Sequence, residues 1–235
     1  MSKALAGRIA LITGASRGIG AAVAKRFAAE GAHVILVART VGGLEETDDA
    51  IKAEGGSATL VPLDLAAPNG IEELGQAIAN RFKRLDILVG NAGVLGTLGP
   101  AAHMDIPVWE RAIAVNLNAN WRLIRSFDPL LRESDAPRAI FVTSGVTGGV
   151  FPYWSAYAAS KAALETLAKT YAAEVAKTKI RVNLLDPGVL RTKMRAEAFP
   201  GENPESLPPP ESVTDRFLEL ALPSCRRHGE IVRAY

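Results

Sequence analysis

The sequence predicts an α/β fold in which a doubly wound parallel sheet of about seven strands carries helices on both faces, giving three layers. Three observations predict it. Short apolar runs, many of them β-branched, recur along the 235 residues and alternate with helical segments. A glycine-rich turn follows the first run. No interdomain linker or internal repeat interrupts the alternation, so residues 1–235 are expected to form a single domain.

Strands and helices follow one another in the order that a parallel sheet requires. The expected strands are 8–13, 33–38, 58–63, 85–89, 139–143, 180–185 and 230–234. The expected helices are 21–30, 41–54, 71–82, 107–129, 155–176 and 213–222. Prolines crowd the stretch between Met194 and Pro210, and proline interrupts regular structure. Residues 193–212 are therefore expected to form an irregular lid segment.

The composition excludes several classes of protein. The net charge is only +2, from 27 basic and 25 acidic residues, which gives no electrostatic case for binding nucleic acid or an anionic membrane. No run of about 18 apolar residues predicts a membrane span, and the first ten residues do not resemble a signal peptide. A single cysteine, Cys225, allows no intrachain disulfide and fits a reducing compartment, so a cytoplasmic location is expected. No metal site is expected.

The turn after the first strand has the spacing of a phosphate-binding loop. Gly14 can leave the strand in a tight turn, Gly18 lets the backbone approach a pyrophosphate, and Gly20 permits close packing of the next helix. A glycine-rich turn without any ligand is the structural alternative. Strand, glycines, helix and second strand occur in the required order, which favours a Rossmann-like nucleotide site.

Two arginines indicate which dinucleotide would bind. The second strand ends at Ala38 and lacks the carboxylate that commonly binds the ribose hydroxyls of NAD. Arg39 follows it, and Arg17 lies inside the glycine turn, so both could bind a 2′-phosphate. We therefore expect NADP(H) in preference to NAD(H), although exposed arginines without a ligand are common. Asp64 follows the third strand and could either bind adenine or cap the next helix.

Tyr157 and Lys161 are four residues apart in a segment that reads as helix, so their side chains should share one face. An ammonium beside a phenol favours the phenolate, which would make Tyr157 a candidate general acid/base. Taken alone, the spacing more often marks a solvated helix face. Ser144 stands at the carboxyl end of the fifth strand, and Asn116 lies within the long helical segment, where it would need partners if buried.

These signals stand in one order along the chain. They are Thr13-Gly14-Ala15-Ser16-Arg17-Gly18-Ile19-Gly20, Asn91-Ala92-Gly93, Asn116, Ser144, Tyr157-x-x-x-Lys161 and Pro187-Gly188-Val189-Leu190-Arg191-Thr192. The ordered set resembles the short-chain dehydrogenase/reductase family, and the resemblance runs from Arg8 to about Thr192.

The resemblance implies roles for four catalytic residues. Ser144 would polarise a carbonyl oxygen, Tyr157 would exchange a proton with it, Lys161 would lower the pKa of Tyr157 and hold the nicotinamide ribose, and Asn116 would hold a water that relays protons. The expected cofactor-binding residues are Gly14, Ser16, Arg17, Gly18, Ile19, Gly20, Arg39, Asp64, Asn91, Ala92, Gly93, Tyr157, Lys161, Pro187, Gly188 and Thr192.

The leading hypothesis is an NADP(H)-dependent oxidoreductase acting on a carbonyl compound or a secondary alcohol. A cofactor-sensing or scaffold protein with the same fold is the alternative, and it would typically lack the tyrosine or the lysine. A methyltransferase-type nucleotide-binding protein would not explain Ser144, Tyr157 and Lys161. Apolar residues near the site favour a hydrophobic small-molecule substrate. Family members commonly pair through two long helices, here 107–128 and 155–176, so a homodimer or homotetramer is expected.

Overall fold

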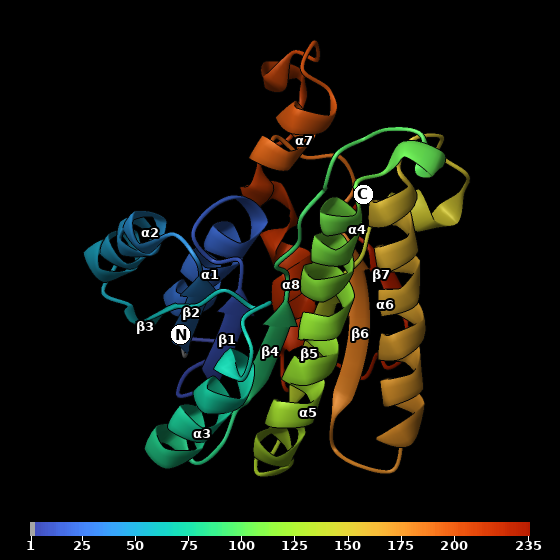
Figure 1. The fold of residues 1–235 in the computed structure, drawn as a ribbon. Coiled ribbons are helices and arrows are strands. Elements are labelled where there is room, and N and C mark those ends of the chain that lie inside the picture. Colours follow the sequence, from blue (N-terminus) through green and yellow to red (C-terminus); the bar gives the residue numbers. More distant parts are fainter. Residues whose placement is uncertain (1–2) are drawn as a thin grey trace.

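The computed structural model describes residues 3–235 and contains a seven-stranded sheet whose neighbouring strands all run parallel (Figure 1). The strands are β1 (Ile9–Thr13), β2 (His33–Ala38), β3 (Ser57–Pro62), β4 (Ile87–Gly90), β5 (Arg138–Val142), β6 (Arg181–Asp186) and β7 (Ile231–Arg233). Their order across the sheet is β3-β2-β1-β4-β5-β6-β7, which confirms the predicted doubly wound fold. The order reverses between β1 and β4, and ligands of such sheets bind outside the carboxyl ends at this reversal.

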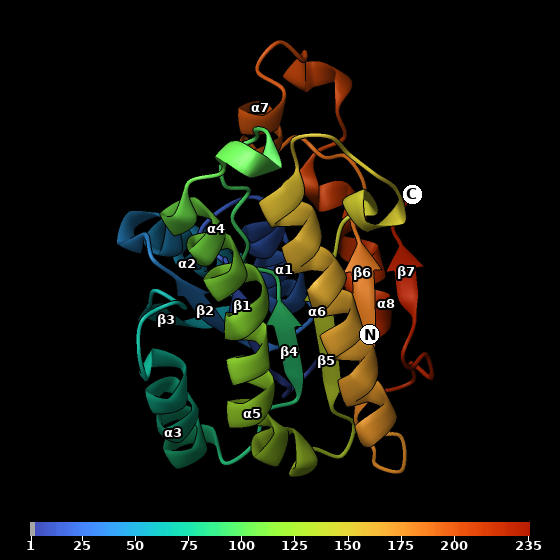
Figure 2. The same cartoon turned by 45° about the vertical axis from the view of Figure 1, so that its right-hand side comes forward.

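Helices cover both faces of the sheet (Figures 1 and 2). One face carries α1 (Gly18–Ala29), α2 (Val41–Ala53) and α8 (Thr214–Ala221). The other carries α3 (Gly70–Phe82), α4 (Ile106–Ile113), α5 (Ala119–Arg132) and α6 (Ser155–Glu174). Figure 2 shows α5 and α6 running side by side across this second face.

The sheet separates two apolar cores. Ala10 and Ile12 of β1 belong to the core under α1 and α8, whereas Leu11 belongs to the core under α5 and α6. This division follows from the alternation of side chains along a strand. Because both faces are covered, all five residues of β5 are buried. Covered faces are the physical reason why the strands read as continuous apolar runs rather than as alternating patterns.

The long helical segment that was expected at 107–129 is present but is not a single α-helix. A π-helical turn, Ala114–Asn118, separates α4 from α5, and the amide of Ala119 bonds the carbonyl of Ala114 five residues earlier. Such turns insert one extra residue and are frequent at functional sites. The periodicity of apolar residues gave no sign of this insertion, and Asn116 lies in the middle of it.

The lid segment 193–212 is more regular than its prolines suggested. It begins with a six-residue helix, α7 (Lys193–Ala198), followed by two 3₁₀ turns, Pro204–Ser206 and Pro210–Val213. The Thr192 hydroxyl accepts a 3.2 Å hydrogen bond from the amide of Arg195 and caps α7. The expectation of irregular structure was therefore wrong for 193–198, because the first proline stands only at Pro200. In Figure 1 this segment projects at the top, beyond the carboxyl ends of the strands.

Two kinds of feature are not found within residues 3–235. No helix there combines the length and the apolar character that crossing a bilayer would require. In the same part of the chain, no three His, Cys, Asp or Glu side chains gather in an arrangement that could hold a metal ion.

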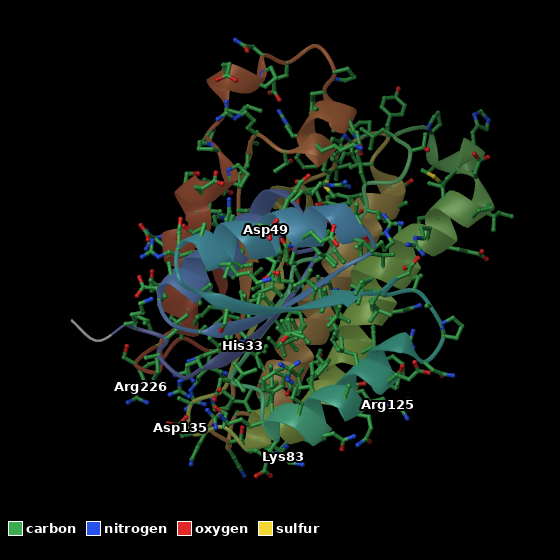
Figure 3. All side chains as sticks on the ribbon, turned by 90° about the vertical axis from the view of Figure 1, so that its left-hand side faces the viewer. His33, Asp49, Lys83, Arg125, Asp135 and Arg226 are labelled. Atoms are coloured by element: carbon green, nitrogen blue, oxygen red, sulfur yellow. The ribbon has the colours of Figure 1, made fainter. Side chains whose placement is uncertain are left out.

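A buried polar network closes the end of the sheet opposite the lid segment. Asp86 is fully buried and accepts hydrogen bonds from Ser134 Oγ at 2.6 Å and from the amide of Ile9 at 2.9 Å. It also pairs with Arg8 at 3.2 Å. Arg8 contacts Asp135 as well, which Figure 3 labels at the lower edge of the molecule. The network ties the starts of β1 and β4 to the loop before β5.

Replacing Asp86 with alanine is expected to lower the free energy of unfolding by about 3 kcal/mol, because Arg8 would keep a largely buried charge without its buried partner. Urea unfolding near neutral pH measures this. The matched control is Asp135→Ala, which removes the exposed partner of the same arginine, its side chain being 77% exposed. That change should lower the free energy of unfolding by less than about 1 kcal/mol. Equal losses in the two variants would contradict the conclusion that Asp86 is the more important partner of Arg8.

Candidate functional site

A cavity of about 1220 Å³ lies at the carboxyl ends of the central strands, and residues that follow β1, β2, β4, β5 and β6 line it. This volume exceeds that of a pocket for a single drug-sized ligand. All of the site residues expected from the sequence line the cavity except Gly20 and Asn116. Those that line it are Gly14, Ser16, Arg17, Gly18, Ile19, Arg39, Asp64, Asn91, Ala92, Gly93, Ser144, Tyr157, Lys161, Pro187, Gly188 and Thr192.

The glycine turn has the shape of an anion cradle. Gly14 and Gly18 adopt φ values of +68° and +57°, a region that side-chain-bearing residues rarely enter. A Cβ on Gly20 would lie 2.3 Å from the carbonyl oxygen of Gly14, so Gly20 supports the turn from behind instead of facing the cavity. The helix α1 begins at Gly18, and the side chain of Arg17 makes no capping hydrogen bond. The first amides of α1 are therefore available to a phosphate, and a dinucleotide pyrophosphate fits this end of the cavity.

Thr13 joins the two turns that form the floor of this cradle. Its hydroxyl accepts 3.0 Å hydrogen bonds from the amides of Asn91 and Ala92 and donates to the carbonyl of Val89 at 3.2 Å. The Asn91 side chain donates in return to the Thr13 carbonyl at 2.8 Å. Sequence reasoning assigned Thr13 no role. The signal was a hydroxyl at the end of an otherwise apolar strand.

Arg17 and Arg39 both line the cavity and are exposed. Within residues 3–235, neither forms an ion pair. Ala38 ends β2 without a carboxylate, as the sequence indicated. The two arginines can therefore offer their charge to an anionic group at this end of the cavity.

Asp64 has a partner that the sequence did not reveal. Both of its carboxylate oxygens lie 2.9 Å from Nη2 of Arg111, which comes from α4 and also lines the cavity. Oδ1 accepts a 3.0 Å hydrogen bond from the amide of Ala66. Burial pushes the pKa of Asp64 upward, but the bonds from Ala66 and Arg111 outweigh it and hold the pKa below its usual value. A carboxylate at this place can accept a further donor while it stays ionised.

Ser144, Tyr157 and Lys161 meet in the part of the cavity beyond the cradle. Ser144 follows β5, its Oγ accepts a 3.4 Å hydrogen bond from the amide of Val146, and its hydroxyl acts to lower the pKa of Tyr157. Tyr157 and Lys161 come from the first two turns of α6 and are 8% and 2% exposed. Nζ of Lys161 donates a 2.8 Å hydrogen bond to the carbonyl of Val142 and lies 5.7 Å from the centre of the Tyr157 ring.

The pKa values of this pair differ from the expectation that Lys161 lowers the pKa of Tyr157. Burial raises the pKa of Tyr157, the hydrogen bond with Ser144 acts in the opposite direction, and the carboxylate of Asp186 raises the pKa further. Burial also lowers the pKa of Lys161 to about 8. The physical reason is that both side chains lie out of water, which disfavours the charged form of each group.

Replacing Lys161 with methionine is expected to stabilise the cofactor-free protein near pH 7 by about 3 kcal/mol, because one pKa unit corresponds to about 1.4 kcal/mol. The pKa of the lysine falls from 10.5 in the unfolded chain to about 8 in the folded one. Protonation therefore opposes folding at low pH, and the stability of the wild type should rise as the pH increases from 8 to 10.5. The advantage of the variant should disappear over the same range.

Urea unfolding at about pH 7 and about pH 10 measures this difference. Lys169→Met provides the control, since Lys169 lies on the same helix with its side chain 49% exposed. The control should show no such pH dependence. If Lys161→Met were no more stable than the wild type at neutral pH, burial of the ammonium would not lower the free energy of unfolding.

Asn116 is fully buried behind the cavity wall. Its Nδ2 donates 2.9 Å hydrogen bonds to the carbonyl of Val94 and to Ser160 Oγ, and its Oδ1 accepts from the amide of Val94 at 2.8 Å. The side chain thus holds the loop after β4 against α6. Asn120 donates to the Asn116 carbonyl at 2.8 Å. The proton relay implied for Asn116 stays a prediction, and these bonds assign its amide a positioning role.

Asp186 and Tyr235 form a second feature that sequence reasoning missed. Asp186 is 3% exposed and accepts hydrogen bonds from the amide of Gly188 and the hydroxyl of Tyr235, both at 3.1 Å. The Tyr235 ring packs on Gly188, where a Cβ would lie 2.7 Å from Cδ1. This pair shapes the turn after β6 that lines the cavity. An acidic residue directly before Pro187 was the available signal.

Apolar and aromatic side chains form the outer wall of the cavity. Leu95, Val146 and Tyr157 make a small buried cluster, against which Met194 and Trp154 pack. The Trp154 ring meets Tyr157 edge-on with ring centres 6.1 Å apart, and it lies 5.9 Å from the ring of Phe199 in the lid segment. Trp154 thus lies beside the phenol, whereas the nearby Tyr153 is 61% exposed.

The chain matches known proteins over most of its length. A family model described as short chain dehydrogenase matches residues 8–203. The oxidoreductase YciK of Escherichia coli K12 is 38% identical over 223 residues, which cover 94% of this chain and 88% of that protein. The 3beta-hydroxysteroid dehydrogenase 1 of Eggerthella lenta is 35% identical over 218 residues, which cover 92% and 81%.

Solved structures agree with these matches. A short chain dehydrogenase from Shigella flexneri 2a complexed with NADP superposes with a TM-score of 0.95 at 36% identity, covering 100% of this chain and 99% of that one. One from Escherichia coli CFT073 complexed with NADPH gives a TM-score of 0.93 at 37% identity with the same coverage.

Proposed function

Because the chain belongs to the short-chain dehydrogenase/reductase family of oxidoreductases, we propose that it transfers a hydride between NADP(H) and a carbonyl compound or secondary alcohol. The observation that carries the proposal is the meeting of Ser144, Tyr157 and Lys161 in the cavity that also contains the glycine cradle. A cofactor-sensing protein would not need a buried phenol and a buried ammonium, since both groups cost stability. The nicotinamide would supply or accept the hydride.

The side chains have separate roles in this proposal. Ser144 orients the carbonyl oxygen of the substrate by hydrogen bonding, and Tyr157 gives that oxygen a proton during reduction or removes one from the alcohol during oxidation. The raised pKa of Tyr157 keeps the phenol protonated at neutral pH, which suits the reductive direction. Lys161 would hold the ribose hydroxyls, and Asn116 would keep the surrounding loop in place.

NADP(H) is proposed over NAD(H) because Arg17 and Arg39 line the adenosine end of the cavity without ion-pair partners in residues 3–235. Their guanidinium groups match a 2′-phosphate, and no carboxylate at the end of β2 would repel it. Two structural relatives whose descriptions name NADP or NADPH as the bound cofactor support the same choice. Asp64 is proposed to bind the adenine amino group, and Thr192 the carboxamide.

The test is a screen of neutral ketones and aldehydes in which the loss of NADPH absorbance is followed. Turnover of several apolar carbonyl compounds is expected, with NADH a much poorer reductant. Tight NADPH binding without turnover of any member of the panel would instead support the cofactor-sensing alternative.

Three organisational points remain proposals. Residues 1–235 are proposed to form one dinucleotide-binding oxidoreductase domain, with 193–212 as its substrate lid. Trp109 on α4 and Trp121 on α5 are 40% and 47% exposed, which suits burial in a homodimer or homotetramer formed by the long helices. A monomeric mass by light scattering at micromolar concentration would exclude this assembly. A cytoplasmic location is proposed from the single cysteine.

A further inference from the structure

The lid segment carries an arginine that faces the candidate substrate but is already engaged. Arg195 lies in α7, and the Thr192 hydroxyl fixes its amide at 3.2 Å. Its side chain lines the cavity and is 24% exposed. Because Thr192 also lines the cavity, this capping bond positions Arg195 relative to the proposed nicotinamide site.

Glu202 occupies the hydrogen-bonding edge of that arginine. Nε of Arg195 donates to Oε2 at 2.6 Å, and Nη2 donates to Oε1 at 2.7 Å. These two parallel bonds form the bidentate arrangement that a guanidinium would otherwise offer to a substrate carboxylate. The hydrogen bonds from Arg195 hold the pKa of Glu202 below its usual value, so the pair is ionised at neutral pH. Glu202 itself does not line the cavity.

The face of the guanidinium is engaged as well. Cζ of Arg195 lies 3.7 Å from the ring centre of Phe199, which contacts Trp154, which in turn contacts Tyr157. Arg195 therefore stabilises the aromatic wall that leads to the proposed proton donor. Glu202 occupies the Nε–Nη2 edge of Arg195 and balances its charge, so a substrate anion would meet a guanidinium that is already neutralised unless it displaced a carboxylate that is 27% exposed.

The other charged groups of the lid segment do not provide a strong alternative site for a substrate anion. Arg191 pairs with Glu205 at 2.8 Å. Lys193 and Glu197 both line the cavity with opposite charges, and they stand four residues apart on α7. Among residues 191–205, Lys193 is thus the cation that lines the cavity and has no ion-pair partner. The negative charge of Glu197, which also lines the cavity, counters that of Lys193.

Resting on the proposed function, we propose that Glu202 is a specificity-determining positioning residue: by holding Arg195 against Phe199, it restricts the substrate to an uncharged apolar carbonyl compound and disfavours one that carries a carboxylate. The restriction acts through Arg195, so it affects the choice between charged and neutral substrates more than the rate of hydride transfer.

The test compares methyl 4-acetylbenzoate with 4-acetylbenzoate, two aryl ketones that differ in the charge of one substituent. The wild type should reduce the ester with a kcat/KM at least about tenfold higher than that for the carboxylate. Glu202→Gln frees the fork of Arg195 and should shrink this ratio about tenfold by raising kcat/KM for the carboxylate. The double variant Glu202→Gln/Arg195→Gln should lose that gain.

Glu219→Gln is the control, because it makes the same chemical change in α8, at a residue whose ion-pair partners, Arg216 and Arg227, do not line the cavity. Its ratio should equal that of the wild type. Equal use of both ketones by the wild type would overturn the proposal, as would an unchanged ratio in Glu202→Gln. Suppose that Glu202→Gln raises kcat/KM for the carboxylate, and that adding Lys193→Gln abolishes this gain while adding Arg195→Gln does not. This result would overturn the proposal too.

Calorimetric binding of both ketones to the NADP⁺ complex separates this inference from the proposed function. If no variant turns over either ketone while the ester still binds better and Glu202→Gln removes that preference, the proposed chemistry fails and the charge restriction stands. If turnover occurs but both ketones bind equally well to the wild type, the chemistry stands and the charge restriction fails. If neither ketone binds, the proposed substrate class is wrong.

Discussion

Replacing Tyr157 with phenylalanine is expected to lower kcat for reduction of an apolar ketone about 10³-fold while leaving the affinity for NADPH within about threefold of the wild type. The change removes one hydroxyl from a ring that is 8% exposed and packed against Trp154, so the wall of the cavity keeps its shape. The carbonyl oxygen loses its proton donor. Steady-state kinetics and NADPH fluorescence titration measure the two quantities.

Tyr153→Phe is the control for this prediction. Tyr153 lies four residues earlier in the chain, is 61% exposed and does not line the cavity. Removing its hydroxyl should leave kcat within about twofold of the wild type. If Tyr157→Phe kept wild-type rates, or if both variants lost activity equally, the assignment of Tyr157 as general acid/base would fail.

Replacing Arg39 with alanine is expected to weaken NADP⁺ binding about 10- to 100-fold and to leave NAD⁺ binding nearly unchanged. A hydrogen bond to a charged group contributes about 1.5–3 kcal/mol, and about 1.4 kcal/mol corresponds to a factor of ten. The 2′-phosphate is the group that distinguishes the two dinucleotides, so the loss should appear only with NADP⁺. Calorimetric titration with each dinucleotide provides the measurement.

The control is Arg125→Ala, which removes an arginine of α5 that does not line the cavity (Figure 3). It should change neither affinity. If Arg39→Ala weakened the binding of both dinucleotides equally, Arg39 would contact a group that they share. If the wild type already bound the two equally, the proposed preference for NADP(H) would be wrong.

The fold could be predicted because each of its signals is local. Covered strands read as apolar runs, and helices separate them, so the seven strands appear in the sequence within one or two residues of their places in the structure. The glycine turn also depends on neighbours in sequence, since Gly14 and Gly20 are only six residues apart. Local patterns therefore specified both the sheet and the cradle.

The remainder depends on contacts between distant parts of the chain. Arg111 meets Asp64 across 47 positions, and Tyr235 meets Asp186 across 49. The pKa of Tyr157 is raised mainly by burial that only the folded chain creates, and the spacing to Lys161 could not show that burial. The π-helical turn at Asn116 left no mark on the apolar periodicity. Proline counting overestimated the disorder of 193–198, because no proline lies inside α7.

The hydrogen bond from Lys161 to the carbonyl of Val142 fixes the ammonium to a central strand of the sheet. Val142 is the last residue of β5, and Ser144 follows it by two positions. One strand therefore carries the proposed carbonyl-binding hydroxyl and also holds the ammonium. Since β4 and β6 flank β5 on both sides, this strand cannot slide without breaking two ladders. Thermal motion should displace the hydroxyl and the ammonium together, so that the spacing between them is preserved.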